Sequence, residues 1–174
     1  MRPTLGILIL LGSLAGCDAA PTDTSPAASL TPGSAPAMRA AAAHPPTPVD
    51  QTFPMENCGF TILVELSGKV KPIEFLDGRS ISTAPGLTAT LTNPANGKQE
   101  TFVITGALHK SVLENGDTLS VATGRNILLD PFVPGLVGVF LTIGSVNWVV
   151  DNEGHLVQPL QGPGKLIDVC ELLA

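Results

Sequence analysis

The sequence contains no tyrosine, and aromatic residues make up only 4% of its 174 residues. Sites that stack nucleic-acid bases or sugars depend on aromatic side chains, so such a platform is poorly supplied. Basic residues are also few, nine against fifteen acidic ones, which gives a net charge of −6. Nucleic-acid binding requires clustered lysine and arginine to neutralise phosphates. Nucleic acid is therefore not an expected partner.

Motifs for catalysis are missing as well. The sequence has no GxSxG, HExxH or CxxC pattern, which are the spacings of a nucleophile elbow, a zinc helix and a redox pair. The histidines of the folded part, His109 and His155, stand alone and are expected at the surface or in turns. We expect no catalytic residue, no metal site and no cofactor. An enzyme is a less favoured interpretation than a binding protein.

Charge is scarce, at 14% of residues, whereas there are 18 glycines and 16 prolines. This balance is unusual for a helical enzyme and typical of short strands joined by turns.

The N-terminus reads as an export signal over residues 1–17. Arg2 precedes the apolar run LGILILLGSLA, which spans 11 residues. A permanent membrane helix needs about 20 apolar residues, so the run suits a signal-peptide core. The four residues Leu14, Ala15, Gly16 and Cys17 resemble the lipobox of bacterial lipoproteins. An ordinary secretory signal is the alternative.

The lipobox resemblance implies that Cys17 is lipidated and becomes the first residue after cleavage. A diacylglyceryl cysteine carries two acyl chains, enough for stable anchoring. The resemblance thus implies an extracytoplasmic protein held to the cell membrane by a lipid anchor.

Residues 18–52 differ in composition from the rest. Alanine, proline, threonine and serine account for 25 of these 35 residues, and bulky apolar residues are nearly absent. Such a segment cannot offset its ordering entropy by burial. We expect a disordered tether that spaces a single domain, residues 53–174, from the membrane.

From Phe53 onward, apolar and polar residues alternate with period two, as in FTILVELS, GLTATLTN and DTLSVATG. Alternation of this kind marks half-buried strands. Between the runs lie Asp77-Gly78, Asn96-Gly97 and Asn115-Gly116, with Asn152-Glu153-Gly154 later. Such pairs are strong hairpin signals. The predicted fold is all-β: an antiparallel sandwich or partly closed barrel of about eight to ten short, hairpin-connected strands.

Two segments are less regular. The run from Phe132 to Val150 is almost entirely apolar, yet its proline, glycines and β-branched residues favour two buried strands over a membrane span. These strands are VGVFLTI and VNWVV, with a bend at Gly144-Ser145. The C-terminal KLIDVCELLA is compatible with a last strand or a short helix.

With Cys17 assigned to lipidation, Cys58 and Cys170 remain at opposite ends of the domain. In an exported protein two such cysteines most simply form a disulfide. The pairing predicts that their Cα atoms lie within about 7 Å.

The stretch ATGRNILLDPF is the most unusual polar cluster. In one interpretation Arg125, Asn126 and Asp130 form a ligand-contact loop. In the other, favoured here, an Arg–Asp pair and asparagine bonds to the backbone brace the loop. Trp148 is expected in the core with its N–H bonded.

The stretches GLTATLTNPANGK, ATGRNILL and GHLVQPLQGPGKLIDVC are similar to small, uncharacterised exported domains of high-GC Gram-positive bacteria. The similarity covers residues 58–172 and implies export and a single domain, without implying an activity.

Three classes of function remain. The first is a binding or envelope-interaction module, with an envelope protein, a glycan or a small ligand as partner. The second is a lipocalin-like carrier, marked by an apolar cavity of several hundred Å³. The third is an envelope hydrolase, which needs ionisable groups converging in a cleft.

Overall fold

The computed structural model describes residues 40–43 and 45–174, which contain thirteen strands and one short helix. All strand pairings are antiparallel, so the predicted all-β class is confirmed. Residues 1–17, with Cys17, lie outside the described residues, as does most of the expected tether.

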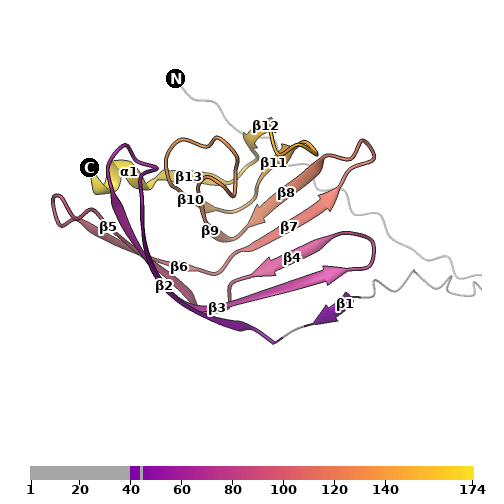
Figure 1. The fold of residues 1–174 in the computed structure, drawn as a ribbon, viewed down its shortest axis with the longest axis horizontal. Coiled ribbons are helices and arrows are strands. Elements are labelled where there is room, and N and C mark those ends of the chain that lie inside the picture. The colour runs from indigo at the N-terminus through magenta and orange to yellow at the C-terminus, as the bar shows by residue number, and fades with distance from the viewer. Residues whose placement is uncertain (1–39, 44) are drawn as a thin grey trace, which may run out of the picture. The chain divides into compact units, whose positions relative to one another are not determined.

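Ten strands form one large sheet (Figure 1). They are β1 (Ala40–Ala43), β2 (Thr47–Met55), β3 (Ile62–Phe75), β4 (Ser80–Thr83), β5 (Leu87–Thr92), β6 (Gln99–Ile104), β7 (Ala107–Val112), β8 (Thr118–Thr123), β11 (Val146–Val150) and β12 (Leu156–Gln161). The main path runs β12-β11-β8-β7-β4-β3-β5-β6, and β1 and β2 add to β3. The sheet does not close into a barrel, and the arrangement is consistent with a sandwich.

Strand β3 connects the two halves of this sheet. Its first part pairs with β2 and β5, and its last part pairs with β1 and β4. Gly68 lies between the two parts with φ +143°. A side chain at this position would overlap the backbone of Gly86 and Leu87, so the crossing requires glycine.

The predicted hairpin turns lie where the sequence placed them. Asp77-Gly78 joins β3 to β4, Asn96-Gly97 joins β5 to β6, and Asn115-Gly116 joins β7 to β8. The glycines of these turns have φ of +81°, +75° and +90°, values that glycine adopts without steric cost.

A second sheet contains β9 (Arg125–Leu128), β10 (Phe140–Ile143) and β13 (Lys165–Asp168), in the order β13-β10-β9. The apolar run of residues 132–150 thus supplies β10 and β11, with Gly144 at the bend, as expected. The ambiguous C-terminus contains both elements: β13 leads into helix α1 (Val169–Leu173). None of the helices in the described residues has the length and apolar character to cross a bilayer.

The main core lies between the two sheets. Ile62, Ala89 and Leu91 of the large sheet cluster with Leu141 of β10 and Leu173 of α1, all nearly or fully buried. A second cluster surrounds Trp148, which is 0% exposed, and includes Val133 and Val146. The Trp148 indole N–H has no acceptor within the described chain, so no protein group there supplies the hydrogen bond expected for it.

Strand β2 extends upstream of Phe53, where the sequence placed the start of the domain. It begins at Thr47 and pairs with β3 along its whole length. Alternation in TPVDQTFPM is hidden by two prolines and by the exposure of most of its side chains. An edge strand tolerates proline, so the composition resembled that of a tether.

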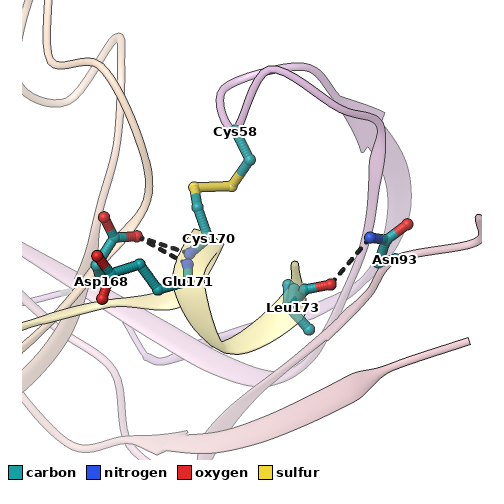
Figure 2. The surroundings of a disulfide bond; sticks show 6 residues. All are labelled: Cys58, Asn93, Asp168, Cys170, Glu171 and Leu173. Carbon is teal, nitrogen blue, oxygen red and sulfur yellow. Dashed lines mark hydrogen bonds between the residues drawn. A yellow bond between two sulfur atoms is a disulfide. The ribbon is translucent and has the colours of Figure 1, made fainter. Parts of the chain in front are cut away.

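Cys58 and Cys170 form a disulfide with a Cα–Cα distance of 5.3 Å, which confirms the predicted pairing. Figure 2 shows how it joins the turn before β3 to helix α1. Asp168 caps the helix by accepting hydrogen bonds from the backbone N–H groups of Cys170 and Glu171, at 2.8 and 3.3 Å. Disulfides are typical of oxidising, extracytoplasmic compartments.

Candidate functional site

An apolar cavity of about 470 Å³ lies between the large sheet and the segment that contains β9 and residues 129–132. Its apolar lining includes Val64, Leu66, Leu87, Leu91, Ile104 and Leu108. Its polar lining residues are Gln51, Ser82, Thr83 and Asn126. None of the described residues that line it carries a charge. Small-molecule sites commonly have this composition and occupy about 300–1,000 Å³.

The inner faces of the strands produce this lining. In β5, Leu87, Ala89 and Leu91 are buried and alternate with half-buried threonines, as the sequence pattern predicted. Small residues at Ala89 and Ala122 leave space where larger ones would fill it. The bend at β3 separates the two halves of the large sheet, and Val70, just beyond the bend, also lines the cavity.

Exposed residues mark the opening of the cavity. They are Gln51 and Phe53 of the edge strand β2 and Pro131 and Phe132 of the segment after β9, which line the cavity and are exposed. The Phe53 side chain is 36% exposed and that of Phe132 is 57% exposed. Large aromatic side chains at a rim can move without disturbing the core, so these two residues are suited to admit a ligand.

The three residues of the expected ligand-contact loop fall in different places. Asn126 lines the cavity. Arg125 does not line it, and its Nε is buried without a hydrogen-bond partner in the described chain. Asp130 accepts a hydrogen bond from the backbone N–H of Gly135 at 3.2 Å.

The brace favoured for this loop is only half present. No ion pair joins Arg125 to Asp130 among residues 45–174. The predicted Arg–Asp pair is therefore wrong. The asparagine bond is present, since Asn126 Nδ2 donates to the carbonyl of Thr123 at 2.9 Å. Of the three residues, Asn126 alone remains placed for ligand contact in this cavity.

Ser82, Gln51 and Phe53 were not predicted from the sequence as site residues, whereas Phe132 closes the stretch ATGRNILLDPF that was. Ser82 lies in the short run SIST, and a small polar residue on the inner face of that strand would indicate a ligand contact. That face is known only once the strand register is known. Gln51 lies in the segment predicted to be a tether, and Phe53 is the first residue of the predicted domain.

A second polar cluster occurs in the β11–β12 turn. Asp151, Glu153 and His155 bring their ligand atoms within 4.8 Å of one another. His155 Nδ1 lies 3.3 Å from Asp151 Oδ2 and 3.7 Å from Glu153 Oε2. The backbone N–H of His155 donates to Asp151 and is the main cause of the lowered pKa of that carboxyl group. These bonds explain the cluster as a braced, solvent-exposed turn.

The chemistry available in the cavity is binding. Because its described lining contains no ionisable side chain, the cavity supplies no general acid, general base or charged transition-state stabiliser. The hydrolase alternative therefore gains no support from this site.

No family model, curated protein or solved structure matches this chain.

Proposed function

We propose that the chain is an extracytoplasmic lipoprotein whose β domain binds a small, mostly apolar ligand between its two sheets. The single observation that carries this proposal is the uncharged cavity of about 470 Å³. Protein interiors are close-packed and contain few voids larger than a water molecule. Because this space opens to the surface, its apolar side chains are in contact with water, and an apolar ligand would remove that apolar area from water.

This proposal combines two of the functions considered from the sequence. A small apolar ligand in a cavity of several hundred Å³ is what the carrier alternative predicted. The scaffold differs from a lipocalin because the sheet is open, so the ligand would lie between sheets rather than inside a closed barrel.

The cavity is tested by filling it from two small lining residues. We expect Ala84→Phe with Ala89→Phe to lower the affinity for the apolar dye N-phenyl-naphthylamine at least tenfold, because both residues line the space. The dye's fluorescence measures binding, and thermal unfolding checks the fold. Mass spectrometry of an organic extract of the purified protein would then identify a natural ligand.

The matched control adds the same rings on the other face of β5. Thr88 and Thr90 alternate with the inward residues and do not line the cavity, so Thr88→Phe with Thr90→Phe should leave dye affinity unchanged. If the folded Ala84→Phe, Ala89→Phe protein binds dye as the unmodified protein does, this cavity is not the site.

Anchoring rests on the lipobox resemblance, and the disulfide supports export. We expect Cys17→Ser to move the protein from the membrane pellet to the soluble fraction. The control is Cys58→Ser with Cys170→Ser, which removes the other two thiols and should leave the protein in the pellet. Persistent membrane association of Cys17→Ser would mean that Cys17 is not the anchor.

A second candidate is contact with another envelope component. Phe132 and Val137, in the connection between β9 and β10, are 57% and 86% exposed, and exposed apolar side chains in one segment favour an interaction surface. Val137 does not line the main cavity. Val137→Ser should therefore weaken co-purification of an envelope partner without changing dye affinity.

A further inference from the structure

We propose that the cavity selects a neutral amphiphile with a hydroxyl group, such as a long-chain or polycyclic alcohol. This inference rests on the proposed binding function and names the class of ligand. It is carried by the lack of charge in the described lining and by two side-chain oxygens, the Ser82 hydroxyl and Asn126 Oδ1, which make no hydrogen bond within the described chain.

The lack of charge excludes ionised ligands first. Burying a charged group without a partner costs several kcal/mol, and no described lysine, arginine, aspartate or glutamate lines the cavity. A fatty-acid carboxylate or an alkylammonium would therefore lose its hydration without gaining an ion pair. A neutral head group avoids this cost.

The strand register points Ser82 into the cavity. Ser82 of β4 lies directly opposite Leu108 of β7, and Leu108 lies opposite Ala122 of β8. Directly paired residues share a face of the sheet, and both Leu108 and Ala122 line the cavity. In the described chain no hydrogen bond involves the Ser82 hydroxyl, so it is available to a ligand.

Asn126 presents its oxygen in a fixed orientation. Its Nδ2 donates to the Thr123 carbonyl at 2.9 Å, which requires the amide nitrogen on that side and leaves Oδ1 as an acceptor. No donor from the described residues reaches this oxygen. Gly106 lies so close that an added Cβ would overlap the amide, so glycine at this position makes room for Asn126.

The strand register places the two groups beside neighbouring residues of the lining. Ser82 is opposite Leu108, and Asn126 contacts Gly106, two residues earlier and therefore about 7 Å along the chain. Asn126 Oδ1 can only accept, whereas the Ser82 hydroxyl can donate or accept. A ligand hydroxyl matches both because it also donates and accepts. An ether or an ester lacks the donor that Oδ1 needs.

The test uses three probes of similar size on the full-length Cys17→Ser chain, which removes the thiol expected to carry the lipid. The probes are decanol, its isomer nonyl methyl ether, and decanoate at pH 8, each measured by displacement of N-phenyl-naphthylamine. One hydrogen bond contributes about 0.5–1.5 kcal/mol. We therefore expect decanol to bind roughly two- to tenfold more tightly than the ether, and decanoate to bind at least tenfold more weakly than decanol.

Two variants assign the preference to its residues. Asn126→Leu should abolish the preference for decanol over the ether, because it removes the acceptor at similar size. Ser82→Ala should weaken decanol binding roughly two- to tenfold while leaving unchanged the binding of decane, a fourth probe that has no oxygen. Ser80 lies two residues earlier on β4 and does not line the cavity, so Ser80→Ala is the matched control. Ser82→Ala removes no hydrogen bond seen in the described chain, so this variant is expected to fold. It therefore still tests the proposal if Asn126→Leu fails to fold.

The outcomes separate the two proposals. If neither the dye nor any probe binds, the proposed function itself is wrong. If decanol and the ether bind equally, or decanoate binds as tightly as decanol, the hydroxyl selectivity is wrong while an apolar site remains. If Ser80→Ala weakens decanol as much as Ser82→Ala does, the assignment of the polar contact to Ser82 is overturned.

Discussion

At the scale of single residues, Asn93 joins two distant parts of the chain. Its side chain is 4% exposed, and its Nδ2 donates to the carbonyl of Leu173 at 2.9 Å (Figure 2). Its Oδ1 also accepts from the backbone N–H of Ala95 at 2.9 Å. The residue thus closes the β5–β6 turn and fixes the end of α1 against it.

We expect Asn93→Ala to lower the free energy of unfolding by about 1–3 kcal/mol, because buried partners lose their hydrogen bonds. Denaturant unfolding measures the change. Asn115 is the control, since it makes similar bonds within the exposed β7–β8 turn. A cost for Asn115→Ala as large as that for Asn93→Ala would contradict the role of burial.

Individual residues also show the limits of reading a sequence. Cys58 and Cys170 could be paired because a single pairing was left once Cys17 was assigned. The polar stretch around Arg125 could be recognised, but Asn126 and Arg125 are adjacent and only Asn126 lines the cavity. The direction of each side chain depends on the register of β9 against β10, which is set by tertiary packing.

At the scale of elements, Gly68 determines how β3 passes from one half of the large sheet to the other. Its φ of +143° is rarely adopted by other residues, and an added Cβ would meet Leu87 Cα at 2.6 Å. All three atoms that an added Cβ would meet belong to the backbone of Gly86 and Leu87, which cannot rotate away as a side chain can.

We expect Gly68→Ala to cost at least about 2 kcal/mol, from an unfavourable φ together with the backbone overlap. Thermal unfolding measures the loss. Gly78→Ala separates the two causes, because Gly78 has φ +81° and open space around it, and should cost about 1 kcal/mol. Equal losses at the two glycines would mean that the close approach to Leu87 is unimportant.

The hairpins were the most predictable elements. Asp-Gly and Asn-Gly pairs act locally, because their positive φ values favour a tight turn whatever the rest of the chain does. β2 was missed for the opposite reason. Its stability comes from pairing with β3 over nine residues, and that pairing is invisible in a proline-containing segment with few buried side chains.

At the scale of the whole molecule, the sequence could not distinguish an open sandwich from a closed barrel. Alternation specifies which side chains face inward, but closure depends on whether the edge strands β6 and β12 meet, and they do not pair. The short strands β9, β10 and β13 form a second sheet instead. The cavity is a product of this arrangement, so its position could not have been predicted.

The disulfide acts on the stability of the whole domain. It joins residues 112 positions apart, and closing a loop of that length restricts the unfolded chain by roughly 4–5 kcal/mol in the chain-entropy model. Measured losses for native disulfides are about 2–5 kcal/mol. We expect Cys58→Ala with Cys170→Ala to lower the free energy of unfolding by about 2–5 kcal/mol, as measured by unfolding in urea.

The same variant should keep its ligand site. Neither cysteine lines the cavity, and α1 remains held by the burial of Val169 and Leu173 and by the bond from Asn93. Dye affinity should therefore stay within about twofold of the unmodified protein, while the unmodified protein under reducing conditions should unfold like the variant. Free-thiol labelling of Cys58 and Cys170 in the native exported protein would contradict the pairing. Loss of dye binding in the folded variant would show instead that the disulfide shapes the cavity although neither cysteine lines it.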